Sequence, residues 1–497
     1  MTNQNVPPYF VKHLPHNCKS VHRKKFREIC VQMELSGSVK ETANTKIKAD
    51  GGLMTCRKTR HRFLVSLVCV QENLAYFAEQ LAVQNTEGCT KVYVAIDGTS
   101  LNIKDSTGHK GLGSIGTEAS GSKGFIVQNS YAVDQDGIPC GILYQKYFTR
   151  PAEKCESSIW ADTLDATVKI VFRNKLSEYV LIIMDRGYDC PDILDRLGAN
   201  TVKIMIRATQ DRKVCPRETT TIKEARKIAR PVLEYLSEIP EMATIEVSVP
   251  VVLKDKESLT GTSNVPTDER RTCTLSLKSV PVNIFLRPKK KQDLDNDSTI
   301  ESKREWLAPA TVLLAEEVNA PKEYEPVRWM LWLNYDVSTP DELKQVISDY
   351  RMRWRIEEFH KIWKSSGTKV EETQARSAEM IEKIARISAI VASNLARMQR
   401  YLEVNPDAPA TTCFSQEEVK GLQIIDKTYY KGRLCKKYGG TKLVFVMALL
   451  AKIGGYENGS KSKVGVKMLT RGYHQVMNLI AGMLLTQGRS RPKLTKL

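Results

Sequence analysis

The sequence predicts an α/β protein built around a buried sheet, and two observations lead to this fold class. Between residues 91 and 210, short β-branched apolar segments alternate with longer stretches that suit helices. The segment Val180–Met184 is apolar at every position, which is typical of a central strand covered on both faces. Hydrophobic residues make up 41% of the 497-residue chain, which is enough for buried cores.

The elements of residues 91–210 follow in order. We expect strands at Val92–Ile96, Phe125–Val133 and Ile138–Phe148, a helix at Ser157–Lys175, a strand at Val180–Met184, a short helix that Leu194–Gly198 closes, and a strand at Val202–Ile206. The turn 134–137, Asp-Gln-Asp-Gly, joins the second strand to the third.

The flanking segments differ in pattern. Residues 1–90 look mostly helical and carry two basic clusters, 21–27 and 57–62, which suit phosphate contacts as well as a solvated face. Residues 211–335 read as a β-rich insertion with strands at Thr244–Leu253 and Thr272–Val280, a polar loop at Arg287–Arg304, and strand character resuming at Thr311–Val318 and Trp329–Leu333. Ser338-Thr339-Pro340-Asp341-Glu342 is a helix start, and we expect helices to about Ser365, at Ala378–Arg400, at Leu443–Lys452 and at Val464–Leu485.

The net charge and the cysteine content limit the classes of function that the protein can have. The chain has 75 Lys and Arg against 57 Asp and Glu, a net charge of +18, which favours a polyanionic partner such as nucleic acid. No apolar run reaches the ~18 residues of a membrane span, and the first residues lack a secretion signal. Twelve cysteines without a C-x-x-C pair favour a reducing compartment, cytoplasmic and nucleoid-associated in a bacterium or nuclear in a eukaryote.

One helix carries the residues that suggest chemistry. Tyr350, Arg353, Glu357 and Lys364 lie at offsets 0, 3, 7 and 14, so an ideal α-helix places them within an arc of about 60°. A solvated salt-bridge face is the plain interpretation of such a stripe. Asp97 and Asp185, however, each follow an apolar strand, and strand ends are where ligand groups converge in α/β sheets.

Three carboxylates that meet need a neutralising partner. Asp97, Asp185 and Glu357 would suit a pair of Mg²⁺ ions, which support in-line phosphoryl transfer. Arg353 and Lys364 would then hold a phosphate backbone, with Tyr350 donating a hydrogen bond. Asp105, Asp189 and Glu358 are the rival acids: the first two lie further into loops, and Glu358 is about 100° out of phase with the stripe.

These residues resemble a known family. Tyr350-x2-Arg353-x3-Glu357-x6-Lys364 is similar to the signature of the insertion-sequence-4 family of DDE transposases, cut-and-paste enzymes of the transposon-5 type. The blocks 95–100, Ala-Ile-Asp-Gly-Thr-Ser, and 183–189, Ile-Met-Asp-Arg-Gly-Tyr-Asp, resemble its first and second catalytic blocks. The resemblance covers about residues 91–485.

The resemblance implies an organisation. Residues 91–370 would form an RNase H-like catalytic domain with the β-rich insertion at about 211–310, residues 1–90 an α-helical domain that binds the DNA end, and residues 371–497 a helical dimerisation region. Asp97, Asp185 and Glu357 would be the catalytic residues and would bind two Mg²⁺ ions, with Mn²⁺ as a substitute. The partners would be double-stranded DNA, as terminal inverted repeats and target, and a second copy of the chain.

The resemblance also assigns DNA contacts. Trp329 would stack on a base flipped out of the DNA end, although its apolar surroundings also suit a core residue and Trp354 is an alternative stacking face. Arg207 would contact phosphate, and Arg186 would steer the metal site or the phosphates. The segment Gly111–Gly116 reads as a loop because no strand-to-helix junction surrounds it, so no nucleotide cofactor is expected.

Other sites are weak. The N-terminal histidines 13, 16 and 22 with Cys18 lack zinc-finger spacing, and His360 suits a position behind the metal site or on the helix surface.

The expected reaction is nicking by water, hairpin formation by the freed 3′ hydroxyl, hairpin opening and strand transfer. The alternatives are a catalytically silent domesticated or regulatory DNA-binding relative and an RNase H-like nuclease without strand transfer.

Overall fold

The computed structural model describes most of the chain from residue 71 onward. The described residues are 29–30, 33, 38–39, 46–49, 52–55, 71–105, 108–116, 121–150, 152, 155–252, 269–287, 305–456, 464 and 466–486. The predicted basic clusters at 21–27 and 57–62, the N-terminal histidines, most of the polar loop 287–304 and residues 487–497 lie outside these residues. Among the described residues before 90, strands β1 (Lys46–Ala49) and β2 (Gly52–Thr55) form an antiparallel pair, which the mostly helical expectation did not include.

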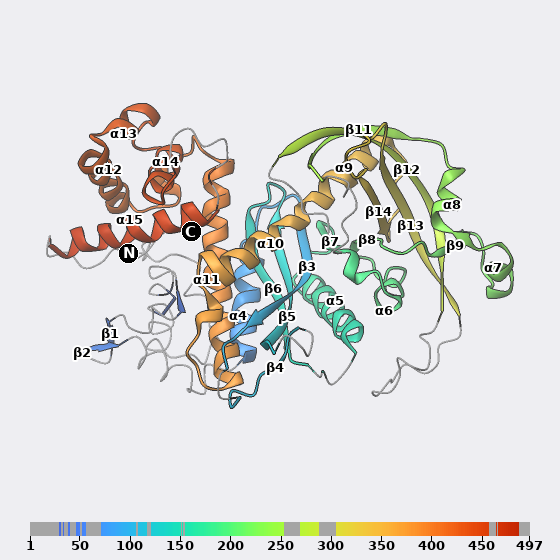
Figure 1. The fold of residues 1–497 in the computed structure, drawn as a ribbon, viewed down its shortest axis with the longest axis horizontal. Coiled ribbons are helices and arrows are strands. Elements are labelled where there is room, and N and C mark those ends of the chain that lie inside the picture. The colour runs from blue at the N-terminus through green and yellow to red at the C-terminus, as the bar shows by residue number, and fades with distance from the viewer. Residues whose placement is uncertain are drawn as a thin grey trace. The chain divides into compact units, whose positions relative to one another are not determined.

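The fold is mixed α/β, with helices and a central mixed sheet (Figure 1). The chain forms two compact units: one contains residues 1–92, 98–151 and 354–497, and the other contains residues 93–97 and 152–353. Strand β3 (Val92–Asn102) contributes its first half to the second unit and its second half to the first. The chain therefore changes units between Asp97 and Gly98, and again between Arg353 and Trp354.

The second unit contains most of the sheet. Its strands, in the order in which they neighbour one another, are β10 (Arg230–Pro231), β9 (Lys213–Pro216), β12 (Arg270–Leu286), β13 (Trp306–Glu317), β14 (Arg328–Leu333), β8 (Lys203–Arg207), β7 (Val180–Met184) and the first half of β3, with β11 (Ala243–Pro250) paired to β12. β7 and β8 are parallel, whereas β8, β14, β13 and β12 alternate in direction. The strands of the insertion thus extend the same sheet that begins at β7 and β8.

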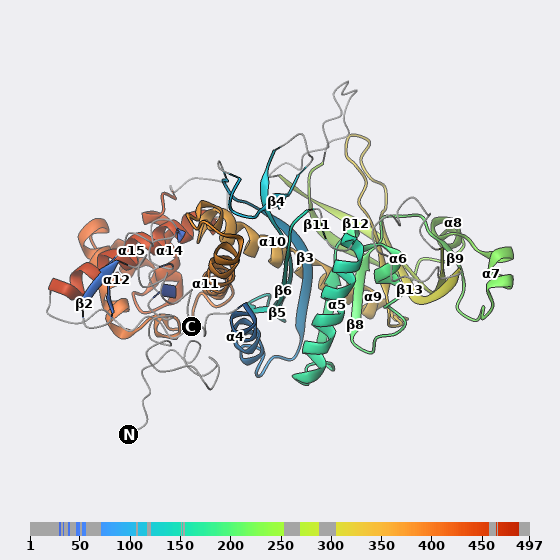
Figure 2. The ribbon, with the colours of Figure 1, turned by 90° about the horizontal axis from the view of Figure 1, so that it is seen from below.

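Helices accompany these strands. They are α5 (Glu156–Arg173), α6 (Pro191–Leu194), α7 (Ile222–Ile228), α8 (Val232–Ser237) and α9 (Pro340–Tyr350). Figure 2 shows α5 running alongside the sheet. α6 begins with Pro191 at the first helical position, where a missing N–H has no consequence, and it ends at Leu194, the first residue of the predicted closing segment. α9 starts as predicted: the Thr339 side chain accepts from the Glu342 N–H, and Glu342 reaches back to the Thr339 N–H.

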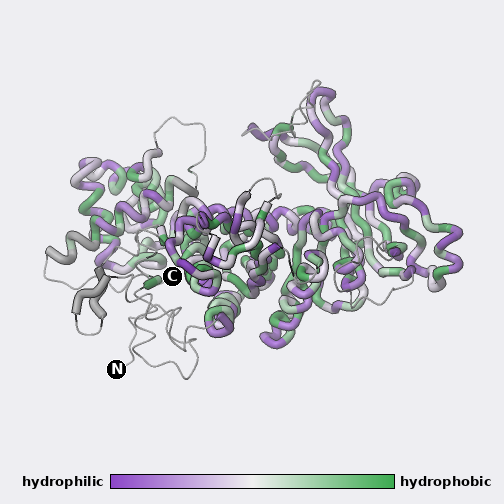
Figure 3. The backbone as a smooth tube through the Cα atoms, turned by 60° about the horizontal axis from the view of Figure 1, so that its bottom comes forward, coloured by the Kyte–Doolittle hydropathy of each residue, from purple (hydrophilic) through white to green (hydrophobic). Residues whose placement is uncertain are grey.

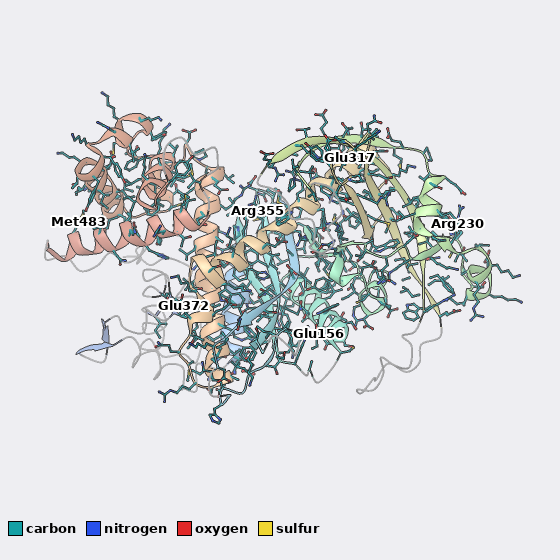
Figure 4. All side chains as sticks on the ribbon, viewed as in Figure 1. Glu156, Arg230, Glu317, Arg355, Glu372 and Met483 are labelled. Carbon is teal, nitrogen blue, oxygen red and sulfur yellow. The ribbon has the colours of Figure 1, made fainter. Side chains whose placement is uncertain are left out.

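A buried ion pair fixes the insertion. Arg271 on β12 contacts Glu317 on β13, and their side chains are 13% and 1% exposed. The Glu317 carboxylate, labelled in Figure 4, also accepts from the Val327 N–H at 2.9 Å. Removing one partner of such a pair leaves the other buried without compensation, so the pair holds the two long strands in one arrangement.

The first unit contains the second half of β3 and further strands of the same sheet. β5 (Lys123–Asp134) pairs with β6 (Pro139–Phe148), with the short β4 (Gly113–Ser114) and with β3. The turn after β5 forms as predicted, with Gly137 at φ 72° and its N–H bonded to the Asp134 carbonyl. Helix α4 (Gln71–Gln84) packs on β6, where Gly141 has φ 141° and an added Cβ would lie 3.0 Å from that of Ala82.

The remaining helices of the first unit come after the last strand in the sequence. They are α10 (Trp354–Lys361), α11 (Ala378–Val404), α12 (Gln416–Tyr430), α13 (Arg433–Tyr438), α14 (Leu443–Ile453) and α15 (Val466–Thr486). α11, α14 and α15 confirm predicted helices, whereas α12 and α13 were not predicted. Figure 3 shows hydrophobic and hydrophilic residues interspersed along the chain, and each of these helices except α13 contains buried residues. In the described part of the chain every helix is too short or too polar to span a lipid bilayer.

Candidate active site

Asp97 lies inside strand β3, which corrects the expectation that it follows the end of a strand. β3 continues to Asn102. Residues 92–96 are buried and residues 97–100 are half-exposed, so the strand changes at Asp97 from fully covered to partly solvated. The apolar pattern marks only the covered half, because a half-exposed strand tolerates polar residues. Asp97 is thus the first residue of β3 that can reach solvent.

Asp185 directly follows β7, as predicted. All five residues of β7 are buried, and Asp185 caps the 3₁₀ turn Arg186–Tyr188. Its Oδ1 accepts a hydrogen bond from the Arg186 N–H at 2.7 Å. The Asp185 side chain is 29% exposed, so it is fixed by the backbone while still open to solvent.

Tyr188 lies close to both aspartates. β7 and β3 are neighbours in the sheet, which places Asp97 and Asp185 on adjacent strands. Burial, and then the negative charges of Asp97 and Asp185, raise the pKa of the Tyr188 phenol well above its usual value. The two carboxylates therefore act on one buried phenol, a role that the sequence did not suggest for Tyr188.

Tyr350 and Arg353 both approach Asp185. The Tyr350 hydroxyl lies 3.4 Å from Oδ1, a long hydrogen bond, and an Arg353 guanidinium nitrogen lies 3.6 Å from Oδ2. Tyr350 is the last residue of α9, and Arg353 ends the 3₁₀ turn Arg351–Arg353 that follows. The end of this helix thus presents a phenol and a cation to the carboxylate that ends β7.

Arg207 and Trp329 surround Tyr350 on its other sides. Arg207 is the last residue of β8 and interacts with the Tyr350 hydroxyl. The Trp329 and Tyr350 rings have centroids 6.2 Å apart. Trp329 is half-buried, so it is not the core residue of its strand, whereas Trp332 is fully buried. Burial and Asp185 raise the pKa of Tyr350, against the opposing charges of Arg207 and Arg353, so its hydroxyl stays a donor at neutral pH.

Asp189, a rival to Asp185, has a structural role. Its side chain is fully buried, and one oxygen accepts from the N–H groups of Thr209 and Gln210 at 2.8 and 3.0 Å. The other oxygen pairs with Arg212 at 2.7 Å. These contacts tie the loop after β8 to the turn after β7 and use the acceptor capacity of the carboxylate.

The other two rivals also have protein partners. One oxygen of Asp105 accepts the Lys110 N–H at 3.2 Å within its own loop. Glu358 pairs with Arg355, labelled in Figure 4, at 2.7 Å and one turn away.

Glu357 and Lys364 belong to the first unit. α10 buries Ile356 and Phe359, with the Phe359 ring stacked on Tyr131 of β5 at 4.5 Å, while Glu357 is half-exposed. The Lys364 ammonium lies 3.5 Å from the Thr99 hydroxyl and 3.7 Å from Glu371. Lys364 therefore lies next to the half of β3 that belongs to the first unit.

The segment 340–366 is not one regular helix, which corrects the ideal-helix stripe. A 3₁₀ turn at 351–353 separates α9 from α10, and residues 362–366 form a π-helical turn in which the Gly367 N–H bonds to the Ile362 carbonyl at 2.7 Å. A 3₁₀ turn winds more tightly than an α-helix and a π turn winds more loosely. The four signature residues are therefore not confined to the 60° arc that an ideal α-helix predicts. Residue spacing alone does not reveal either irregularity.

Trp354 and His360 occupy opposite environments. Trp354 is 56% exposed. His360 is buried, with Nε2 3.1 Å from the Asn129 side-chain nitrogen, so the helix-surface alternative is wrong. Burial, and then the nearby Lys364 charge, lower the pKa of His360 to about 3, so the ring is neutral at physiological pH.

Asp349 is a further residue that sequence reasoning missed. This buried carboxylate accepts hydrogen bonds from the Tyr93 hydroxyl at 2.8 Å and from the Gln345 amide at 2.7 Å. It precedes Tyr350, and Tyr93 lies on β3 four residues before Asp97. The contact therefore ties the end of α9 to the strand that carries Asp97. An aspartate within an amphipathic helix gave no signal of burial.

The residues of the second unit fit part of a divalent-metal site. Asp97 and Asp185 supply the carboxylate oxygens that Mg²⁺ prefers, on adjacent strands, and Asp185 is open to solvent. Within the described ranges, no group of three or more His, Cys, Asp or Glu side chains is close enough to hold a metal ion. The aspartate pair is therefore compatible with a metal that also takes ligands from water and substrate.

Comparison with known families identifies the family of the chain. A family model described as a transposase DDE domain matches residues 89–395, more than half of the chain. The match begins just before β3, and it includes Asp97, Asp185, Glu357, the insertion and the first two thirds of α11. The chain belongs to the DDE transposase family.

Proposed function

We propose that the chain is a cut-and-paste DNA transposase of the insertion-sequence-4 type with an RNase H-like core. The observation that carries the proposal is the arrangement around Asp185. A carboxylate at the end of a buried strand meets a phenol and a guanidinium from one helix end, next to the strand that carries Asp97. The four residues of the family signature, Tyr350, Arg353, Glu357 and Lys364, supply the rest of the argument.

Asp97, Asp185 and Glu357 would together hold two divalent cations, Mg²⁺ or Mn²⁺. The positions of Asp97 and Asp185 on adjacent strands support this assignment. Glu357 is included because it is the acid of the sequence signature. The ions would supply Lewis-acid stabilisation of the attacking and leaving oxygens of a phosphoryl transfer. Among the rival acids, Asp189 is fully buried and bonded to Arg212 and to two backbone N–H groups, whereas Asp185 is open to solvent, which favours Asp185 over Asp189.

The cations of the site would orient the DNA backbone. Arg353, Arg207 and Lys364 can each donate to phosphate oxygens, and the protonated Tyr350 hydroxyl can do the same. Trp329 would receive a base flipped from the DNA end, because its face is half-exposed beside Tyr350. Trp354, the more exposed ring, is the alternative stacking face.

The reaction would proceed as four phosphoryl transfers at one site. Water nicks one strand at the element end, the freed 3′ hydroxyl attacks the opposite strand to form a hairpin, water opens the hairpin, and the 3′ hydroxyl attacks target DNA. A homodimer would hold two ends, with residues 371–497 contributing to dimerisation and residues 1–90 to end binding.

The test is to incubate the purified protein with DNA that carries the terminal inverted repeats of its element, in the presence of Mg²⁺. Hairpin-ended products support the proposal. DNA that is bound but uncut supports a silent regulatory relative, and nicked products without hairpins or strand transfer support a simple nuclease. Single-turnover conditions with labelled strands separate the nick from the later steps.

A further inference from the structure

The positive charge of the chain is concentrated near its C-terminus. Residues 419–497 contain sixteen Lys and Arg but only two acids, Asp426 and Glu457, a difference of +14 within a chain whose net charge is +18. These residues include most of α12 and all of α13, α14 and α15. A bundle that served only to pack against other protein would not need this imbalance, since soluble surfaces normally mix both signs.

The exposed cations gather on α12 and α13. We call Lys420, Lys427, Lys431, Arg433, Lys436 and Lys437 the C-terminal cationic surface, and all six are exposed. Lys420 and Lys427 are seven residues apart, two helical turns, so they share one face of α12. The opposite face of α12 is packed: an added Cβ at Gly421 would lie 2.7 Å from the Ile480 side chain of α15.

The only acid between Lys420 and Lys437 is used inside the protein. Asp426 is buried, and its two oxygens accept the N–H groups of Leu434 and Cys435 at 3.2 and 2.9 Å. Its carbonyl accepts the Gly432 N–H, which closes the turn between the two helices. The acid therefore shapes the turn and does not neutralise the surface cations by an exposed ion pair.

Helix α13 is held in place without being packed. None of its six residues is buried, although Asp426 fixes its start and the Gln423 amide donates to the Gly440 carbonyl at 2.9 Å just beyond its end. Figure 1 shows α13 at the outer edge of the C-terminal helices. Lys436 and Lys437 follow Arg433 by three and four residues, so like charges are neighbours on the helix, which destabilises it.

We propose that the C-terminal cationic surface binds the phosphate backbone of duplex DNA independently of base sequence. Within the described ranges, no acid forms an ion pair with Lys427, Lys431, Arg433 or Lys436, in contrast to Lys442, which pairs with Asp407 at 2.9 Å. A polyanion would relieve the repulsion between these cations and release its own counterions. Lysine and arginine contacts to phosphate carry no base information, so the surface fits duplex DNA outside the terminal repeat, either flanking or target.

This inference rests on the proposed function only in taking DNA as the substrate, and its test needs no cleavage. Binding of a random-sequence duplex without divalent metal is measured by fluorescence anisotropy over a range of salt concentrations. The variant K427Q/K431Q/K436Q/K437Q should bind at least about tenfold more weakly at low salt. Its slope of log affinity against log salt should fall by about 2–4, since each lost phosphate contact removes about 0.9.

Two further variants control the result. K213Q/K223Q/K227Q/K322Q removes the same charge from four exposed lysines of the second unit and should leave the slope unchanged. The arginine variant K427R/K431R/K436R/K437R should retain tight binding. Unfolding in urea checks that each variant is folded.

Three results would overturn the inference. The first is an unchanged salt slope in the C-terminal glutamine variant, and the second is an equal loss in the control of matched charge. The third is a lysine dependence seen with phosphatidylglycerol vesicles but not with DNA. If the parent protein bound DNA with the expected salt dependence but formed no hairpin products, that result would contradict the proposed function and leave this inference standing.

Discussion

The phenol hydroxyl of Tyr350 lies 3.4 Å from Oδ1 of Asp185, although 165 residues separate the two in the chain. This contact joins the end of α9 to the end of β7. It also explains why the signature around Tyr350 and the block around Asp185 belong to one arrangement. The second oxygen of Asp185 lies next to Arg353, so one carboxylate contacts two of the four signature residues.

Tyr350→Phe should slow DNA cleavage about tenfold and leave the free energy of unfolding nearly unchanged. The substitution removes one long hydrogen bond to a charged group. Hydrogen bonds of this kind contribute at least about 1.5 kcal/mol, and a rise of the activation free energy by that amount slows a reaction roughly tenfold. Single-turnover cleavage and urea unfolding measure the two effects. A normal cleavage rate would show that the hydroxyl only fills space beside Asp185.

Trp329→Ala should slow hairpin formation and opening more than the first nick. The ring lies beside Tyr350 and is half-exposed, so a flipped base can stack on it for about 1–3 kcal/mol. Gel assays that resolve nicked, hairpin and opened ends give the three rates. Trp354→Ala is the matched control, and a hairpin defect in that variant alone would move the stacking role to the exposed ring.

Asp189→Ala should destabilise the protein by about 3–5 kcal/mol, because Arg212 would keep its charge in a buried position without its partner. The backbone N–H groups of Thr209 and Gln210 would lose their acceptor as well. Urea unfolding measures the loss. If Asp189→Ala were as stable as the parent but inactive, Asp189 would be a functional acid rather than a structural one.

His360 should make stability depend on acidity. Its pKa is about 3 in the folded chain against an ordinary value of 6.5, so the unfolded chain binds the proton more readily. The stabilisation is complete above pH 6.5 and is lost as pH falls toward 3, at up to about 1.4 kcal/mol per pH unit. His360→Gln should flatten this slope. The same steep loss in the variant would assign it to other groups.

The sequence predicted the elements that bury apolar faces and missed features set by tertiary contacts. β7 and α11 were located correctly because their apolar periodicity is strong. β3 was judged too short, since its second half is half-exposed and polar. The 3₁₀ and π turns on either side of α10 could not be predicted, because residue type does not determine such local changes in winding.

Within the candidate site, sequence blocks identified Asp97, Asp185, Tyr350 and Arg353 but not their partners. Tyr188 is a buried phenol next to a charged block, and nothing in its neighbours marks it. The contact between Asp349 and Tyr93 joins residues 256 positions apart. Such a pair becomes visible only when the chain is folded.

The most direct measurement of the central claim is the Mg²⁺-dependent cleavage of a terminal-repeat substrate by Asp97→Asn, Asp185→Asn and Glu357→Gln. Each variant should retain end binding and lose cleavage by at least about 10³-fold, since each would remove a carboxylate from one metal site. The matched variants Asp105→Asn and Glu358→Gln should cleave at nearly the parental rate. Parental cleavage by any of the first three, or equal loss in the matched pair, would contradict the account.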